Sequence, residues 1–138
     1  MGHFRDGKFY VFADPVKGQD IGYGHLVTSE ERASGVFRNG ITAEEAKQLL
    51  IKDLQRSVNG AKKLYAQYEL QTPYLCQLVL VQMAYQMGPG ALGKFKGMFS
   101  AIKAGRYDLA AHHIRDSLWY RQTTSRAETM AKYMEACQ

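Results

Sequence analysis

The 138-residue sequence lacks the features that define several specialised classes of protein. Its two cysteines, Cys76 and Cys137, show no metal-ligand spacing and allow at most one disulfide bridge. Because no secretion signal is recognisable, we expect both thiols to be reduced. Apolar runs such as residues 78–81 are much shorter than the roughly 20 residues that span a bilayer. These absences exclude a disulfide scaffold and predict a globular domain without stable membrane insertion.

Motifs for common metal and cofactor chemistry are also missing. The sequence has no complete Walker loop, HExxH pair, GxSxG elbow or CxxC pair, so nucleotide binding, zinc proteolysis and the α/β-hydrolase fold are poorly supported. The adjacent His112 and His113 cannot share one helix face, so they do not form an i,i+4 metal pair. We therefore expect no metal and no cofactor.

The charge balance is basic but dispersed. Lys and Arg number 18 against 13 Asp and Glu, which gives a formal charge of +5. Such a balance favours a polyanionic partner, whether nucleic acid, anionic lipid or an acidic cell-wall polymer. Nucleic acid is disfavoured because no basic stripe with aromatic platforms is present.

Secondary-structure signals divide the chain into two parts. Residues 1–41 hold seven of the 13 glycines, and the β-prone run at residues 9–12 and the segment at residues 20–25 predict a small antiparallel sheet with exposed loops. The Asp6-Gly7 pair predicts a tight turn that pairs His3-Phe4 with Phe9-Tyr10. We expect Glu30 and Glu31 to be surface charges.

From Thr42 onward the pattern is helical. A capping box at Thr42–Glu45 opens a helix from residue 43 to about 66, and residues 75–87 predict a central buried helix. Further helices are predicted from Leu92 to Gly105, over residues 107–118, and from a second capping box at Ser125–Glu128. The predicted class is α+β, as a single domain: a small sheet lobe (1–41), a connecting helix (42–66) and a larger helical lobe (67–138).

Asp6, Asp14 and Asp20 lie at turns and strand ends of the predicted sheet lobe. Hydrolysis of a glycosidic bond needs one protonated and one ionised carboxyl group, and acids on turns that face a cleft could supply both. The plainer alternative is that these aspartates hydrogen-bond their own backbone, as Asp at turns commonly does. His25 could equally be a structural hydrogen-bonding residue.

Four separated motifs resemble one family. Residues 21–26 (IGYGHL), with Asp14 seven residues before Ile21, resemble the signature of phage-type lysozymes of glycoside hydrolase family 24. Residues 39–53 are similar to that family's interdomain helix and residues 82–88 to its central helix. Residues 117–127 are similar to lysozymes carried on phage tails and virions. The resemblance covers residues 9–135 and implies a lysozyme-like fold.

The resemblance also implies roles for individual residues. Asp14 matches the catalytic aspartate that orients or activates the attacking water. His25 and Asp53 match a structural pair between the sheet lobe and the long helix, and Arg126 matches the arginine that supports the general acid. Six residues match positions on or beside the substrate cleft: Gly24, Leu26, Tyr85, Gln86, His113 and Gln122.

Two departures from the family pattern concern catalysis. Asp20 stands where the family usually has Thr, and it could act as a base or nucleophile. The family's general acid is a Glu in a Glu-Gly pair roughly nine residues before the aspartate, whereas the first Glu of this chain is Glu30. Either Asp6 takes that place, or Met1-Gly2 occupies it and the acid was lost upstream, which is the alternative we favour.

The resemblance implies a muramidase that cleaves the β-1,4 bond between N-acetylmuramic acid and N-acetylglucosamine. The implied partner is bacterial peptidoglycan, and the chain would be a monomer or a domain of a larger virion protein. We expect it in the virion, or in the host cytoplasm before release, and acting on the wall in the periplasm. Two alternatives remain: a peptidoglycan-binding domain without the acid, and a lytic transglycosylase.

Overall fold

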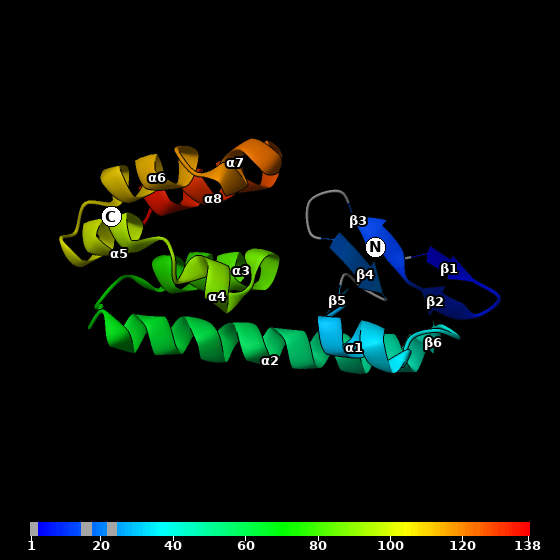
Figure 1. Cartoon of the computed structure of the whole chain (residues 1–138). Coiled ribbons are helices and arrows are strands. Elements are labelled where there is room, and N and C mark those ends of the chain that lie inside the picture. The colour runs from blue at the N-terminus through cyan, green and yellow to red at the C-terminus, as the bar shows by residue number, and fades with distance from the viewer. Residues whose placement is uncertain (1–2, 15–17, 22–24) are drawn as a thin grey trace. The chain divides into compact units, whose positions relative to one another are not determined.

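The computed structural model describes residues 3–14, 18–21 and 25–138, with side chains for residues 4–11, 21, 25 and 27–138 (Figure 1). The chain divides into two compact units, Met1–Gln55 and Arg56–Gln138. Small antiparallel sheets lie in the first unit and helices make up the second, which confirms the predicted α+β class. The prediction of a single domain with three sections stays a prediction.

The first sheet contains strands β1 (His3–Arg5), β2 (Lys8–Tyr10) and β6 (Ile41–Thr42), in the order β1-β2-β6. Asp6 and Gly7 turn the chain between β1 and β2 with φ angles of 50° and 74°. Both values suit a tight hairpin turn whose twist matches that of the strands. His3 pairs with Tyr10 and Phe4 with Phe9, which confirms the predicted hairpin.

The second sheet contains strands β3 (Phe12–Asp14), β4 (Gly18–Ile21) and β5 (His25–Leu26), in the order β3-β4-β5. The expectation of one small sheet is therefore wrong. The β-prone run at residues 9–12 is divided at Val11, so its two ends belong to different sheets. Among the described side chains, the buried apolar core of this unit contains Phe9, Ile21, Val27, Phe37, Ile41 and Ala46.

A short helix that the sequence reading missed, α1 (Ser29–Ser34), follows β5. Thr28 caps it: its hydroxyl accepts the Glu31 amide at 3.1 Å, and the Glu31 carboxylate accepts the Thr28 amide at 2.8 Å. Gly35 ends the helix at φ 69°, where a Cβ atom would lie 2.8 Å from the Arg38 guanidinium. Residues at both ends of this segment therefore stabilise it as a helix.

The long helix α2 (Ala43–Gln67) confirms the predicted helix and its capping box. The Thr42 amide donates to the Glu45 carboxylate at 2.8 Å, and the Glu45 amide donates to the Thr42 hydroxyl at 3.1 Å. Gly60 lies within this helix because a Cβ atom there would approach the Pro89 ring to 2.5 Å. Close packing explains a glycine that is unfavourable for the helix itself.

The second unit contains α3 (Tyr74–Met87), α4 (Pro89–Leu92), α5 (Lys96–Lys103), α6 (Tyr107–Arg115), α7 (Leu118–Gln122) and α8 (Thr124–Glu135). The predicted central helix is confirmed: α3 buries Cys76, Val79, Leu80, Met83 and Ala84 in the core of this unit. Helix α8 packs against α3, α6 and α7. Among the described residues, no helix is long and apolar enough to span a bilayer.

Three helix boundaries differ from the prediction. The helix expected from Leu92 begins only at Lys96, because Leu92 is the last residue of α4. The expected helix over residues 107–118 ends at Arg115, and Ser117 begins α7 by accepting the Tyr120 amide at 3.1 Å. The prediction of a second capping box at Ser125–Glu128 is wrong, because α8 begins one residue earlier, at Thr124. The carboxylate of Glu128, which would have capped the helix, accepts hydrogen bonds from Arg115 instead.

Candidate functional site

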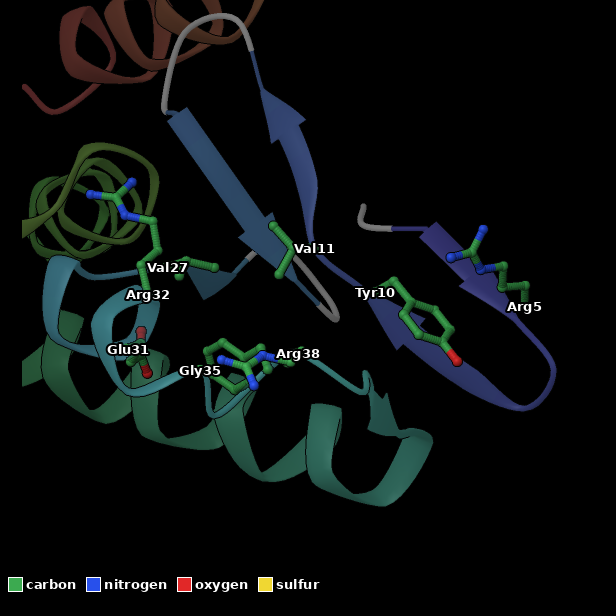
Figure 2. Close-up of a pocket in the computed structure, with 9 residues that line it drawn as sticks. Arg5, Tyr10, Val11, Val27, Glu31, Arg32, Gly35 and Arg38 are labelled. Atoms are coloured by element: carbon green, nitrogen blue, oxygen red, sulfur yellow. The ribbon is translucent and has the colours of Figure 1, made fainter.

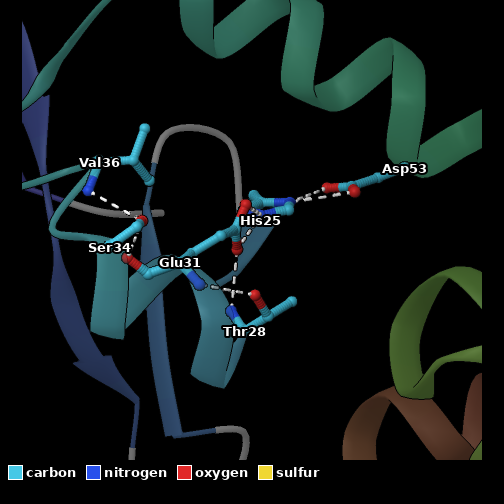
Figure 3. A network of polar contacts seen from close by, with 6 residues as sticks. All are labelled: His25, Thr28, Glu31, Ser34, Val36 and Asp53. Atoms are coloured by element: carbon cyan, nitrogen blue, oxygen red, sulfur yellow. Dashed lines mark hydrogen bonds and ion pairs between the residues drawn. The ribbon is translucent and has the colours of Figure 1, made fainter.

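His25 of β5 is the centre of the most extensive polar network in the described part of the first unit (Figure 3). Its Nδ1 atom lies 2.9 Å from Oδ2 of Asp53 on α2, and its Nε2 atom lies 3.0 Å from Oε1 of Glu31 on α1. Only 5% of the His25 side chain is exposed. The network therefore joins β5, α1 and α2 at a buried position.

The geometry favours the protonated form of His25. A neutral imidazole carries one N–H, whereas here both ring nitrogens face carboxyl groups, so both nitrogens donate when the two carboxyl groups are ionised. The Asp53 hydrogen bond raises the pKa of His25, burial opposes this, and the Glu31 hydrogen bond adds to the increase. Burial alone would raise the pKa of Glu31, but the bonds from Thr28 and His25 outweigh it and the pKa is lowered.

The pairing of His25 with Asp53 is the contact that the family resemblance implies, and Glu31 is an additional partner that the sequence reading missed. Glu31 was expected to be a surface charge, but it lies 3.0 Å from the histidine. The Thr28-x-x-Glu31 spacing was the available signal, since a capping glutamate is held next to the start of its helix. Its contact with His25 depends on the fold and could not be read from spacing.

The backbone of Asp14 and Asp20 lies on neighbouring antiparallel strands. Asp20 on β4 pairs with Phe12 on β3 and with Leu26 on β5, and Asp14 pairs with Gly18. Asp14 and Asp20 are therefore diagonal neighbours, at a Cα separation of roughly 7–8 Å. The side chains of both aspartates and of Leu26, and the whole of Gly24, lie outside the described residues.

Asp6 occupies the first position of the β1–β2 turn, with a left-handed φ of 50° and an exposed side chain. Asp is one of the few residues other than Gly that tolerate this conformation. The turn alone therefore explains why Asp stands at this position, and the exposed carboxyl group faces solvent. A catalytic role for Asp6 stays a proposal.

The remaining predicted site residues belong to the second unit. Tyr85 and Gln86 are half-buried on the last turn of α3, and Gln122 and Arg126 are exposed on α7 and α8. The Oε1 atom of Gln86 is buried and has no hydrogen-bond partner within the described part of the chain. Buried polar atoms without a protein partner commonly accept a hydrogen bond from an ordered water molecule.

His113 on α6 is half-buried against α5. A Cβ atom at Gly97 would lie 2.6 Å from its ring, so the glycine provides the space that the imidazole fills. Packing thus holds this side chain in place.

Arg115 forms a second network that the sequence reading missed. Its Nε and Nη2 atoms donate to the two oxygens of Glu128 at 2.9 and 3.0 Å, and Nη2 also reaches Glu135 at 2.7 Å. The Tyr120 hydroxyl donates to Glu128 at 2.9 Å. The Arg115 bonds, followed by that of Tyr120, lower the pKa of Glu128 to about 2. The network joins α6, α7 and α8.

A cavity of about 400 Å³ lies in the first unit (Figure 2). Arg5, Tyr10, Glu31, Arg32 and Arg38 are among its lining residues, and the Arg5 guanidinium lies 4.5 Å from the centre of the Tyr10 ring. Figure 2 shows the three guanidinium groups pointing in different directions, so they do not form one anion site. In the described ranges, no three His, Cys, Asp or Glu side chains gather in a way that could hold a metal.

Comparison with known proteins identifies the family. The phage lysozyme family model matches residues 6–132, which is most of the chain. The chain therefore belongs to the phage lysozyme family, as the four motifs indicated.

Three relatives come from bacteriophages. The chain is 33% identical over 128 residues to peptidoglycan hydrolase gp36 of Pseudomonas phage phiKMV, with 93% of this chain and 14% of that protein covered. It is 40% identical over 122 residues to the pre-baseplate central spike protein Gp5 of Enterobacteria phage T4, covering 85% of this chain and 21% of that protein. The peptidoglycan hydrolase gp36 of Enterobacteria phage SP6 is 28% identical over 119 residues, with 78% of this chain and 12% of that protein covered. The chain thus spans about a fifth or less of each relative.

Proposed function

We propose that this chain is a muramidase that hydrolyses the β-1,4 bond between N-acetylmuramic acid and N-acetylglucosamine in bacterial peptidoglycan. The observation that carries this proposal is the match of residues 6–132 to the phage lysozyme family. Two relatives named as peptidoglycan hydrolases support the choice of polymer. The net charge of +5 would concentrate the enzyme on anionic bacterial envelopes.

The proposed chemistry divides between two carboxyl groups. Asp14 orients the attacking water, and a protonated carboxyl group gives its proton to the leaving sugar oxygen. Asp6 is one candidate for this acid, and a glutamate of a longer natural chain is the other; Arg126 would support either one. The register of β3 and β4 supports a role for Asp20 next to Asp14, as a second base or as a nucleophile.

Substrate binding is proposed for Gly24, Leu26, Tyr85, Gln86, His113 and Gln122. The buried Gln86 oxygen has no partner among the described residues, so a rotation of this side chain toward a bound sugar would not break an existing bond of that oxygen. His25 and Asp53 would support the site from the first unit by holding β5 against α2.

The chain is further proposed to be a domain of a larger virion protein. It matches only 14%, 21% and 12% of three phage relatives, one of which is a central spike protein. Such a domain would be carried in the virion and would act on the cell wall in the periplasm.

Clearing of chloroform-treated Gram-negative cells tests the activity. We expect the chain to reduce the turbidity of the cells. The clearing activity of the Asp14→Asn variant should be about 10²–10⁴-fold lower, the usual effect of removing an acid–base group. Asp116→Asn is the matched control, because Asp116 is an exposed aspartate at the end of α6. Full activity of Asp14→Asn would contradict the proposed role, and full activity of Asp6→Asn would exclude Asp6 as the acid.

A peptidoglycan-binding domain without hydrolysis is the second candidate. The observation that favours it is the position of Asp6 in a tight turn, which leaves the described residues without an evident general acid. Such a domain would sediment with purified sacculi and leave the turbidity of the cells unchanged.

A further inference from the structure

Cys76 and Cys137 come together in the core of the second unit although 60 residues separate them in sequence. Cys76 lies in the first turn of α3, and Cys137 follows the end of α8. Their exposed fractions are 0% and 1%, and their thiols lie close enough to interact with one another. Helices α3 and α8 pack directly against each other.

We propose that Cys76 and Cys137 form an intramolecular disulfide when the chain meets a disulfide oxidant, and that this bond joins α3 to the end of α8. The reaction is a pair of thiol–disulfide exchanges. One cysteine thiolate attacks the oxidant disulfide, R–S–S–R, and releases one R–SH as a mixed disulfide forms. The second cysteine then displaces the other R–SH, so two thiols are oxidised and one disulfide is reduced.

The positions favour a bond within the chain over a bond between chains. Both sulfurs lie inside the core, so a second chain can reach a sulfur only while the end of α8 is open. The Cys137 thiol donates to the Tyr133 carbonyl at 3.3 Å, which fixes its side chain near the end of α8. The two thiols interact and their helices pack together, and the bond requires Cα atoms roughly 4.4–6.8 Å apart.

Burial makes the reaction slow and dependent on opening. It raises the pKa of Cys76 to about 12 and also raises the pKa of Cys137, so little of either thiol is in the reactive thiolate form. Cys137 lies two residues beyond Glu135, the last residue of α8, and its amide donates to Met134 at 3.1 Å. Opening of this final turn is sufficient to expose one of the two sulfurs.

The consequence is a domain that is reduced when made and more stable after oxidation. A reducing cytoplasm keeps both thiols free, whereas the periplasm supplies disulfide oxidants. Closing a loop of about 60 residues lowers the entropy of the unfolded chain and so raises the melting temperature. Only this choice of compartment rests on the proposed function; the pairing itself rests on the positions of the two cysteines.

Oxidation of the folded chain with oxidised glutathione tests the pairing. Intact mass spectrometry under denaturing conditions should show a monomer that has lost two hydrogen atoms, and peptide mapping should join the fragments that contain Cys76 and Cys137. The melting temperature should rise by several degrees and return when dithiothreitol is added. Cys76→Ala and Cys137→Ala serve as matched controls and should show no oxidant-dependent change in melting temperature.

Three results would overturn the proposal: two alkylatable thiols after prolonged oxidation, glutathione adducts that do not resolve, or disulfide-linked dimers. The wild-type chain provides the decisive mass, so a control variant that fails to fold does not obscure the result. Cell clearing is a separate readout, and a chain that forms the bond but clears no cells would contradict only the proposed function.

Discussion

The carboxylate of Glu31 lies 3.0 Å from Nε2 of His25, on the opposite side of the ring from Asp53. The buried ring is thus held between two carboxyl groups that come from different helices, an arrangement that favours its protonated form. Removing a charged group from water is costly unless its partners replace the lost hydration, and here each N–H has an ionised acceptor. The pair of contacts predicts both how the first unit responds to pH and which substitutions weaken it.

The Glu31→Gln substitution should destabilise the chain by about 1–3 kcal/mol, the usual size for a hydrogen bond to a charged group. The pKa of His25 is raised, so its contribution is fully present below its ordinary value of 6.5 and is lost as pH rises through the folded-state pKa. The pKa of Glu31 is lowered, so its contribution is present above 4.5 and is lost as pH falls. Urea unfolding should therefore show the largest difference between wild type and variant at pH 4.5–6.5.

Glu30→Gln is the matched control, because Glu30 is an exposed neighbour in the same first turn of α1. It should leave stability nearly unchanged. A difference between Glu31→Gln and wild type that does not vary from pH 5 to pH 9 would contradict the ion-pair account.

Titration of His25 by NMR should separate the two carboxylates. The hydrogen bond that His25 makes to Asp53 is the largest cause of its raised pKa, and the bond that it makes to Glu31 has a smaller effect. We expect the midpoint to fall in Glu31→Gln and to fall further in Asp53→Asn. A larger effect of Glu31→Gln than of Asp53→Asn would contradict the ranking of Asp53 as the main cause of the raised pKa of His25.

The Arg115 network should govern the acid stability of the second unit. The pKa of Glu128 is lowered to about 2, so its stabilising contribution is present above its ordinary value of 4.5 and is lost as pH falls toward 2. Glu128→Gln should therefore reduce the melting temperature at pH 6 and have little effect near pH 2.

Asp108→Asn provides the comparison for Glu128. Asp108 pairs with Arg106 at 3.3 Å, but the two side chains are 62% and 60% exposed, and exposed ion pairs contribute little. An effect of Asp108→Asn as large as that of Glu128→Gln would contradict the importance of the Arg115 network.

Gly60→Ala should destabilise the chain although alanine is the better helix former. Propensity alone would stabilise α2 by about 1 kcal/mol. The new methyl group would lie 2.5 Å from the Pro89 ring, and overpacking of this kind typically costs about 1–3 kcal/mol. Chemical denaturation should show a net loss, whereas Gly90→Ala, which has open space around it, should show none. A more stable Gly60→Ala variant would mean that Pro89 can move away.

Local signals predicted those elements whose partners are near in sequence. The Thr42–Glu45 capping box, the long helix and the Asp6-Gly7 hairpin all depend on residues a few positions apart, and the structure contains each of them. The Ser125–Glu128 box has the same spacing but fails. Its glutamate finds a stronger partner in Arg115, which lies 13 residues earlier in the chain and was not visible to a local pattern.

The candidate site was predictable to a similar extent. Resemblance to a family implied the contact of His25 with Asp53, 28 residues apart, which periodicity alone could not give. Glu31 was missed because its contact depends on where β5 and α1 fold together. The division of the sheet at Val11 was missed for a related reason: a β-prone run does not specify which strands its residues pair with.

The most direct test of the central claim is mass spectrometry of the products released from purified Gram-negative peptidoglycan. The proposed muramidase should release muropeptides with a reducing N-acetylmuramic acid end, and Asp14→Asn should release far less at equal protein concentration. Products that are lighter by one water and carry a 1,6-anhydro end would show that the reaction is lytic transglycosylation and not hydrolysis. No release at all, from a folded chain that still sediments with the wall, would contradict the enzymatic account.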